Sequence, residues 1–547
     1  MSFIKRVEQS IVSNWMGDAL TDYKGVTLQY NDLARRIEKH HILFRECGIE
    51  PGDRIAVCGR NSAAWAVAFL ATVTYRAVVV PILHEFKPDN IHTIVNHSEA
   101  RMLFAGDVVW ENINEEAMPN LEGIVNISTF KPTVDRTGKL TATFERLNEL
   151  FGKRFPCKFR SSSVCYEAES SPEDLVLINY TSGTTGHSKG VMLPYRSLTS
   201  NVDYCESLIR LNPGDHVVSM LPMGHVFGMT FDFLYGVCAG AHIFFLTRIP
   251  SPKVIMQAFP EIKPRVVSTV PLIVEKIVKK VVLPRVDNPL GKLLFQLPVI
   301  SDLIKTRARE EAMNAFGGNI EQIIVGGAPF NSEIEAFLRK ISFPYTIAYG
   351  MTECGPIISA SRWDELKQGS CGRAAYNMEV CIDSPDPYNI PGELLCKGTN
   401  LMLGYYKNKE ATDEAVDTNG WLHTGDMALC DEAGNITIKG RCKNMLLTSS
   451  GQNIYPEEIE AVLNNMPYVA ESLIVLNGEK LVALVYPDFE DATANQITDQ
   501  NIEKVMEQNL TELNSTLPRY SQITKVRIYP EEFEKTAKRS IKRFMYQ

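Results

Sequence analysis

Hydrophobic and polar positions alternate along the first part of the chain in a pattern typical of strands separated by helices. Apolar residues recur at helical spacing in some segments and form short continuous runs in others. The pattern predicts helices over 31–47 and 63–74 and strands over 54–58 and 77–82, with Asn31 as the N-cap of the first helix and Gly48 at its end. Strands joined by helices of this length favour parallel β-α-β units.

The same alternation continues further along, and its texture changes after Gly392. Five more strands are expected, over 174–179, 217–221, 242–246, 266–269 and 322–325. Beyond Gly392 the strands become shorter and richer in turns, and Gly440-Arg441 marks a candidate boundary. The remaining residues contain expected helices over 457–465 and 501–513 and strands over 472–476 and 481–486, which is enough for a small α+β domain. The fold class is therefore predicted as α/β, with a large multi-subdomain N-terminal domain (1–440) and a small C-terminal domain (441–547).

Composition and charge narrow the class of protein. The 547 residues are 45% hydrophobic and carry a net charge of −9 without long runs of one sign, which argues against a dedicated nucleic-acid binder. The 12 cysteines are scattered without a C-x-x-C, and the ten histidines contain no H-x-x-x-H. No zinc site is expected, and thiols spread in this way predict a cytoplasmic protein. No signal peptide is expected at the N-terminus. The most apolar stretch, 63–83, is interrupted by Arg76 and Pro81, so it is expected to be a buried helix and strand and not a membrane span.

The most informative stretch is the polar segment 181–190, which reads T-S-G-T-T-G-H-S-K-G between two apolar runs. Its glycines let backbone N–H groups converge, its hydroxyls add donors and Lys189 adds a positive charge, all of which suit a polyphosphate. A polar surface loop is the plainer interpretation. The segment also contains G-x-S-x-G around Ser188, the pattern of a serine-hydrolase nucleophile elbow. That elbow requires a helix directly after the serine, and residues 191–194 do not begin one.

Several further motifs, in this order, resemble those of the adenylate-forming superfamily, which contains acyl-CoA synthetases, luciferases and peptide-synthetase adenylation domains. The resemblance covers nearly the whole chain, from about Tyr30 to Arg543. After the segment 181–190 it rests on L-P-M-G-H-V-F-G (221–228), Y-G-M-T-E (349–353), G-E-L (392–394), G-Y-Y (404–406), W-L-H-T-G-D (421–426), G-R (440–441) and G-Q-N-I-Y-P-E-E-I-E (451–460).

The resemblance implies a two-step reaction that uses ATP, Mg²⁺ and coenzyme A. A carboxylate attacks the α-phosphorus of ATP to give an acyl-adenylate and pyrophosphate, and the thiol of coenzyme A then displaces AMP. Chemistry of this kind depends mainly on positioning and on neutralising phosphate charge. It also implies that the small C-terminal domain is mobile and rotates about a hinge at Lys443 between the two steps.

The resemblance also implies roles for individual residues. The β- and γ-phosphates would be held by Thr181, Ser182, Gly183, Thr184, Thr185, Gly186 and Lys189. Glu353 would bind Mg²⁺ and Thr352 would contact the α-phosphate. Adenine and its surroundings would involve Gly327, Ala328, Pro329, Tyr349, Gly350 and Met351. His225 would lie near the acyl carboxylate, Asp426 and Arg441 would reach the ribose, and pantetheine would pass Gly451.

The C-terminal tail departs from the family pattern. Ser540 stands where the family has the lysine that enters the site for adenylation, and a serine hydroxyl cannot supply a positive charge. Lys542, or less readily Lys538, is the expected substitute, and a merely basic, solvated tail is the alternative. Asn444 likewise replaces an acid that usually follows the hinge.

The substrate is the least determined part of the prediction. Residues 226–229 contain no acid and Asp232 falls several residues late, which disfavours an amino acid because a buried ammonium needs a partner. The segment 271–283 sets one face of apolar residues (Ile273, Val274, Ile277, Val278, Val281) against three lysines (Lys276, Lys279, Lys280). It is either a core-packed helix or a peripheral contact with anionic lipid.

This region and the V-F-G context most resemble long-chain fatty acyl-CoA synthetases. The predicted function is thus a fatty acid–CoA ligase (AMP-forming) whose partners are a fatty acid or related carboxylic acid, ATP and coenzyme A. The alternatives are a ligase for another acid or acceptor, a serine hydrolase using Ser188, and a catalytically impaired nucleotide- and acyl-binding protein.

Overall fold

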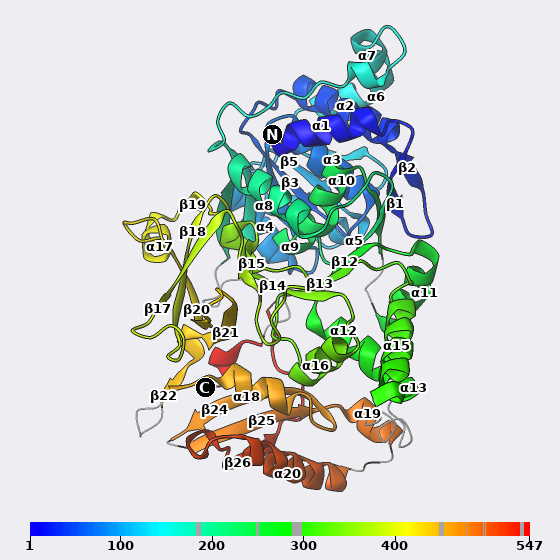
Figure 1. The fold of residues 1–547 in the computed structure, drawn as a ribbon. Helices are drawn as coiled ribbons and strands as arrows, with labels where there is room; N and C mark the ends of the chain where they lie inside the picture. Colours follow the sequence, from blue (N-terminus) through cyan, green and yellow to red (C-terminus); the bar gives the residue numbers. More distant parts are fainter. Residues whose placement is uncertain are drawn as a thin grey trace. The chain divides into compact units, whose positions relative to one another are not determined.

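The computed structural model describes residues 1–181, 188–247, 251–286, 298–447, 453–478, 480–495, 497, 499–536 and 541–546. The fold is α/β, as predicted, with a large N-terminal and a small C-terminal part (Figure 1). The chain divides into two compact units. The larger unit contains Met1–Ala328, Ala336–Glu379 and Lys397–Leu422, and the smaller contains Pro329–Glu335, Val380–Cys396 and His423–Gln547.

An eight-stranded sheet forms one part of the larger unit. Its strand order is β19-β9-β8-β4-β3-β5-β6-β7, and the strands are β3 Arg54–Cys58, β4 Val78–Ile82, β5 Met102–Ala105, β6 Gly123–Asn126, β7 Lys131–Asp135, β8 Leu175–Thr181, β9 Lys189–Pro194 and β19 Gly404–Tyr405. The strands from β8 through β4, β3 and β5 to β6 are parallel, which confirms the predicted β-α-β units. The antiparallel neighbours β9 and β19 close the edge of the sheet that carries the polar segment.

A second, nine-stranded sheet forms the other part of the larger unit. Its order is β16-β15-β14-β13-β12-β10-β11-β1-β2, and the strands are β1 Asp18–Asp22, β2 Thr27–Gln29, β10 His216–Ser219, β11 His242–Phe245, β12 Val266–Thr269, β13 Gln322–Gly326, β14 Tyr345–Gly350, β15 Ile357–Ala360 and β16 Arg373–Ala374. All residues of β12 and β13 are buried, as expected for parallel strands covered on both faces. In such sheets, ligands bind outside the carboxyl ends of the strands.

Helices accompany both sheets, and the prediction for the first of them needs one correction. Helix α2 begins at Tyr30, with Gln29 and not Asn31 at the N-cap, because the Asp32 carboxylate accepts the backbone N–H of Gln29 at 3.3 Å. The helices before α16 are α1 Phe3–Ser13, α2 Tyr30–Glu46, α3 Ala63–Thr74, α4 Pro88–Ser98, α5 Asp107–Trp110, α6 Lys139–Glu145, α7 Leu147–Arg154, α8 Tyr195–Leu208, α9 Val226–Gly228, α10 Tyr235–Ala239, α11 Pro252–Ile262, α12 Pro271–Ile277, α13 Leu283–Val286 and α15 Pro298–Ala315. They are followed by α16 Ser332–Lys340 and α17 Lys409–Ala415.

The amphipathic segment 271–283 packs its apolar side into the protein. It runs through α12 and a π-helical turn, Val278–Val282, into α13. Four of the five predicted apolar positions are buried (Ile273, Val274, Ile277, Val278), whereas Lys276, Lys279 and Lys280 are exposed. The core-packed interpretation therefore accounts for the apolar face. Among the described residues, no helix combines the length and the apolar character that crossing a bilayer requires.

The smaller unit holds two main sheets and its own core. One sheet has the order β17-β18-β20-β21, from β17 Met378–Asp383, β18 Gly392–Gly398, β20 Leu422–Cys430 and β21 Ile436–Arg441. The other joins β24 Val469–Asn477, β25 Lys480–Pro487 and β26 Lys525–Ile528, with α18 Pro456–Leu463, α19 Phe489–Ala494, α20 Asp499–Thr516 and the short pair β22 Leu446–Leu447 and β23 Asn453–Ile454. Apolar residues from α18, α20 and the strands, among them Leu463, Ile474 and Leu513, form one buried cluster.

Candidate active site

Two neighbouring strands bring the adenine-site candidates to one edge of the nine-stranded sheet. Strands β13 and β14 are parallel with Gly326 opposite Ala348, so Gly327, directly after β13, and Tyr349, near the end of β14, come at the same edge of the sheet. Gly327 has a positive φ of 87° and is exposed. A Cβ at Gly350 would lie 2.0 Å from the carbonyl oxygen of Pro356, so only glycine fits there. Of the remaining candidates, Ala328 and Met351 belong to this same unit, whereas Pro329 belongs to the smaller one.

Thr352 and Glu353 form a tight turn directly after β14. The turn is a single 3₁₀ turn, Thr352–Cys354, and the two residues are only 4% and 8% exposed. The side-chain amide of Asn201 on α8 holds it, because Nδ2 donates to the carbonyl of Cys354 at 3.0 Å and Oδ1 accepts the N–H of Ile357 at 2.9 Å. The backbone of the turn that carries Glu353 is therefore held by α8.

Tyr405 connects Glu353 to the strand that carries Lys189. The hydroxyl of Tyr405 donates to Oε1 of Glu353 at 2.8 Å, and the Nζ of Lys189 lies 4.8 Å from the centre of the Tyr405 ring. The backbone N–H of Met402 donates to the carbonyl of Glu353 at 2.8 Å. Burial, followed by the neighbouring Glu353 carboxylate, raises the pKa of the Tyr405 hydroxyl, so it stays a neutral donor.

The polar segment connects two paired antiparallel strands. Thr181 ends β8 and lies opposite Lys189, which begins β9; residues 182–187, with five of the predicted phosphate-binding residues, lie outside the described part of the chain. Because a strand and not a helix follows Ser188, the nucleophile elbow of a serine hydrolase is not formed here.

His225 caps a helix beside the same strands. Its Nδ1 accepts the N–H of Phe227 at 3.4 Å at the start of α9. The preceding carbonyl, of Gly224, accepts a 2.8 Å hydrogen bond from Asn179 on β8, so the histidine turn is tied to the strand that leads into the polar segment. Phe227 approaches the end of β13, where a Cβ on Gly326 would lie 3.1 Å from its ring.

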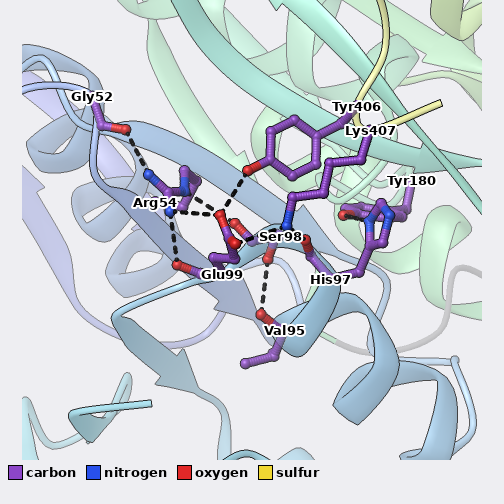
Figure 2. Close-up of polar contacts among 9 residues, drawn as sticks. All are labelled: Gly52, Arg54, Val95, His97, Ser98, Glu99, Tyr180, Tyr406 and Lys407. Atoms are coloured by element: carbon purple, nitrogen blue, oxygen red, sulfur yellow. Dashed lines mark hydrogen bonds and ion pairs between the residues drawn. The ribbon is translucent and has the colours of Figure 1, made fainter. Parts of the chain in front are cut away.

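A polar cluster that the sequence analysis did not identify lies beside Tyr180, the residue before Thr181 (Figure 2). The Tyr406 hydroxyl donates to Oε2 of Glu99 at 3.0 Å, and Lys407 pairs with Oε1 of Glu99 at 2.8 Å. His97 lies 2.7 Å from the Tyr180 hydroxyl and edge-on to the Tyr406 ring. The G-Y-Y motif was the one sequence signal that pointed to Tyr405 and Tyr406, but a motif does not reveal their partners.

The ribose-site candidates face each other across two strands of the smaller unit. Asp426 on β20 pairs in register with Arg441 on β21, and Nε of Arg441 lies 2.8 Å from Oδ1 of Asp426. The Asp426 side chain is 8% exposed and that of Arg441 is 55% exposed. An ionised carboxylate held in this way can accept hydrogen bonds from hydroxyls.

Ion pairs hold the C-terminal tail of the smaller unit. Lys542 pairs with Glu534 at 2.9 Å, and Arg543 pairs with the buried Glu460. Burial raises the pKa of Glu460 to about 7 despite that guanidinium. The other tail candidates, Lys538 and Ser540, and the pantetheine candidate Gly451 lie outside the described residues.

The hinge candidate, Lys443, lies in a 3₁₀ turn, Cys442–Asn444. Beside it, Asn444 donates to Oε1 of Glu457 at 2.6 Å. The side-chain amide of Asn444 thus provides a hydrogen bond to Glu457 on the neighbouring helix, at a position where the usual acid is missing.

Glu353 fits the way Mg²⁺ is bound in nucleotide enzymes, where the protein supplies only some of the ligands. Over the described part of the chain, no three His, Cys, Asp or Glu side chains gather as a metal site. Mg²⁺ in nucleotide enzymes is commonly bound by one or two carboxylates together with substrate phosphates and water. A single buried carboxylate that accepts a hydrogen bond from a neutral hydroxyl fits that donor set.

Comparison with known proteins gives the same assignment over both parts of the chain. The family model described as AMP-binding enzyme matches residues 11–406, and the one described as AMP-binding enzyme C-terminal domain matches residues 443–546. The chain is 26% identical to a rat long-chain-fatty-acid–CoA ligase 5 over 92% of its own length and 80% of the relative.

Two further proteins show how widely the similarity extends. A rice (Oryza sativa subsp. japonica) 4-coumarate–CoA ligase 5 is 30% identical over 82% of this chain and 77% of the relative. The solved structure of the anthranilate CoA ligase AuaEII with anthranoyl-AMP superposes with a TM-score of 0.78 at 18% identity, covering 100% of this chain and 96% of that one. Together with the order of the motifs and the carboxyl-edge site, these matches establish that the chain belongs to the AMP-binding enzyme family.

Proposed function

We propose that this protein activates a long-chain fatty acid with ATP and transfers the acyl group to coenzyme A. The general activity follows from the family: the chain is an adenylate-forming acid–CoA ligase. The fatty acid is the finer part of the proposal, and it is supported by the long-chain ligase of rat, which aligns with 92% of this chain.

In the first step a carboxylate oxygen of the acid forms a bond to the α-phosphorus of ATP, and pyrophosphate leaves. Thr181 and Lys189, with the segment between them, hold the β- and γ-phosphates, and Thr352 contacts the α-phosphate. The observation that carries this assignment is that Lys189 and Glu353 both contact the side chain of Tyr405. A cation and a carboxylate thus lie against the same residue. Convergent donors and charges of this kind act mainly by positioning.

Glu353 holds Mg²⁺ in this proposal, and Mg²⁺ supplies the charge that offsets the phosphates. Tyr349, Gly350, Met351 and Gly327, with Ala328 and Pro329, border adenine. Two observations at the carboxyl edge support this. The positive φ of Gly327 disfavours a side chain there, and the carbonyl oxygen of Pro356 leaves no room for one at Gly350. His225 is placed near the reacting carboxylate, where its cap position fixes the ring.

In the second step the sulfur of coenzyme A bonds to the acyl carbon, and AMP leaves. Asp426 and Arg441 hold the ribose, and pantetheine passes Gly451. We place the domain division at 440/441 and the hinge at Lys443, with residues 441–547 as the part that rotates between steps. The two family matches support this, since one ends at residue 406 and the other begins at 443.

The charge around the expected acyl site favours an acid without an amino group. Asp232, the acid nearest to the histidine motif, is fully buried, and burial raises its pKa well above the usual range of a carboxyl. It therefore favours its neutral form and is a poor partner for an ammonium. The exposed Lys276, Lys279 and Lys280 support a weak peripheral contact with anionic lipid, and liposome flotation that is insensitive to neutralising them would dismiss it.

The test is ATP–pyrophosphate exchange with a panel of acids: fatty acids from short to long chains, 4-coumarate and an amino acid. We expect exchange to be fastest with long-chain fatty acids, and AMP to form at the same rate as acyl-CoA once coenzyme A is present. Fastest exchange with 4-coumarate would retain the ligase and overturn the fatty acid. No exchange with any acid would overturn the activity and favour a nucleotide-binding protein that does not turn over.

A further inference from the structure

Tyr405 stands between two charged residues of the nucleotide site. Its hydroxyl hydrogen-bonds Glu353 at 2.8 Å, and the same ring lies 4.8 Å from the Nζ of Lys189. We infer that Tyr405 is a positioning residue, which aims the Glu353 carboxylate at Mg²⁺ through its hydroxyl and holds the Lys189 ammonium through its ring. This inference rests on the proposed function of the same site.

The group that orients the Glu353 carboxylate is neutral. In the described part of the chain, no lysine, arginine or histidine forms an ion pair with Glu353, and its one side-chain partner is the Tyr405 hydroxyl. A neutral donor fixes one carboxylate oxygen without cancelling its charge. The carboxylate is thus oriented without an ion-pair partner among the described residues.

The ring of Tyr405 serves the lysine in a similar way. An ammonium near an aromatic ring is attracted to it without being neutralised. The contact follows from strand pairing, because β19 lies antiparallel to β9 with Tyr405 opposite Val191, two residues after Lys189. An acid at position 405 would pair with Lys189 and repel Glu353, whereas a tyrosine attracts both.

The backbone on both sides of Tyr405 is tightly held, so its side chain is well placed to orient others. Its own N–H donates to the hydroxyl of Thr412 at 2.9 Å, and the N–H of Tyr406 donates to the carbonyl of Gly190 at 2.7 Å. Lys407 has a positive φ of 53°, a conformation that costs energy in a non-glycine residue. Its ion pair with Glu99, shown in Figure 2, ties this turn to the end of α4.

The experiment measures ATP binding by calorimetry with Mg²⁺ and, separately, with EDTA, so that it does not depend on the acid. Tyr405→Phe removes only the hydroxyl, and we expect roughly tenfold weaker binding in Mg²⁺ but wild-type binding in EDTA. Tyr405→Leu also removes the ring, and we expect a further loss of about threefold that persists in EDTA. In a Glu353→Gln background, Tyr405→Phe should cause little further loss.

The matched control is Tyr376→Phe, which deletes the hydroxyl of a tyrosine that is 67% exposed and should leave binding unchanged in both buffers. Circular dichroism of each variant checks that it is folded, and Tyr405→Phe, which conserves volume, carries the test if Tyr405→Leu does not fold. Wild-type affinity of Tyr405→Phe in Mg²⁺, or an equal loss in EDTA, would overturn the role of the hydroxyl. A wild-type chain that binds no ATP in either buffer would instead contradict the proposed function, and the inference would fall with it.

Discussion

Two buried glutamates, one in each compact unit, are stabilised in opposite ways. Glu353 in the larger unit is 8% exposed and receives a hydrogen bond from the neutral hydroxyl of Tyr405. Glu460 in the smaller unit is 6% exposed and pairs with the guanidinium of Arg543, and its Oε1 accepts the N–H of Ile474 at 2.6 Å. One carboxylate is left with its charge uncompensated, and the other is given a cation from its own chain.

The difference separates residues that await a ligand from residues that hold the fold. A carboxylate with an internal cation has little left to offer an external one, whereas a carboxylate with a neutral donor still attracts Mg²⁺. The same contrast applies to the lysines. Lys189 rests on an aromatic ring, but Lys542 is already paired with Glu534. The larger unit is thus arranged before the nucleotide arrives, and the smaller unit has to give up an ion pair if its tail is to act.

The strongest test of this contrast is Glu353→Gln. An amide cannot bind Mg²⁺ as a carboxylate does, so we expect ATP–pyrophosphate exchange to fall roughly 10³-fold, or about 4 kcal/mol. Thioester formation from preformed acyl-adenylate should change much less, because no polyphosphate takes part in it. Glu410→Gln, at an exposed position of α17, is the control. Equal losses in both half-reactions would mean that Glu353 supports the fold and not the metal.

Lys542→Ala tests whether the tail contributes to chemistry. If Lys542 replaces the missing lysine at position 540, removing it should slow adenylation roughly 10²-fold and leave thioester formation from acyl-adenylate within about threefold. Lys535→Ala removes a lysine of the same tail that pairs with Glu471 at 2.5 Å and with Glu532 at 3.1 Å, and it should affect neither step.

The partner of Lys542 sharpens the same question. Glu534→Gln removes the 2.9 Å ion pair and should leave adenylation unchanged or faster, because Lys542 is then released more easily. If Lys542→Ala and the wild type have equal rates in both half-reactions, Lys542 takes no part in the mechanism. The tail would then be a solvated basic segment.

Glu460 provides a test through pH. Its pKa is raised to about 7, above the 4.5 of the free side chain, because burial outweighs Arg543. A group whose pKa is raised on folding favours the folded state at low pH, and this contribution is lost as pH rises toward 7. We expect the smaller unit to lose about 2 kcal/mol of stability between pH 5 and pH 7, or roughly 30-fold in hydrogen-exchange protection of β24 after correction for intrinsic rates.

Glu460→Gln should remove that dependence, since an amide does not titrate and its oxygen can still accept the N–H of Ile474. Glu458→Gln is the matched control on the same helix, because Glu458 is 46% exposed and pairs with Lys439 at 2.8 Å. A slope that survives in Glu460→Gln would assign the pH dependence to another group.

Local patterns in the sequence were sufficient for several elements of the larger unit. Helix α3 and strand β3 match their predicted bounds, because each is an apolar run bordered by turn residues. The N-cap of α2 was misplaced because Asp32 caps the helix from inside its first turn, which makes Asn31 look like the start. Strand alternation and motif order together were enough to predict the fold class and the family.

Contacts between distant residues were not predictable in the same way. Tyr405 and Glu353 are 52 positions apart, and their hydrogen bond depends on the register of β19 against β9. A shift of one residue would turn the tyrosine to the other face of the sheet. The ion pair of Arg543 with Glu460 likewise depends on tertiary packing, because the two partners are 83 positions apart in the sequence.

The smallest expected effect concerns Asp426. Like Glu460 it forms an ion pair within its own chain, with Arg441, and like Glu353 it is proposed to contact the nucleotide, at the ribose. Asp426→Asn removes a charged acceptor, so we expect the KM for ATP to rise about tenfold with the KM for the acid unchanged. Arg441→Gln should cost only about threefold, because its side chain is 55% exposed and solvent weakens the pair. Asp413→Asn, at an exposed site of α17, is the control.

The cause of the Asp426 effect can be separated with 2′-deoxy-ATP. If the carboxylate accepts a hydrogen bond from the ribose, wild type should lose affinity for the deoxy nucleotide, and Asp426→Asn should discriminate less between it and ATP. A variant that loses affinity equally for both nucleotides would show that Asp426 acts through Arg441 alone. In that case Asp426 would resemble Glu460, as a carboxylate committed to its own chain, and only Glu353 would remain as an acid held open for a ligand.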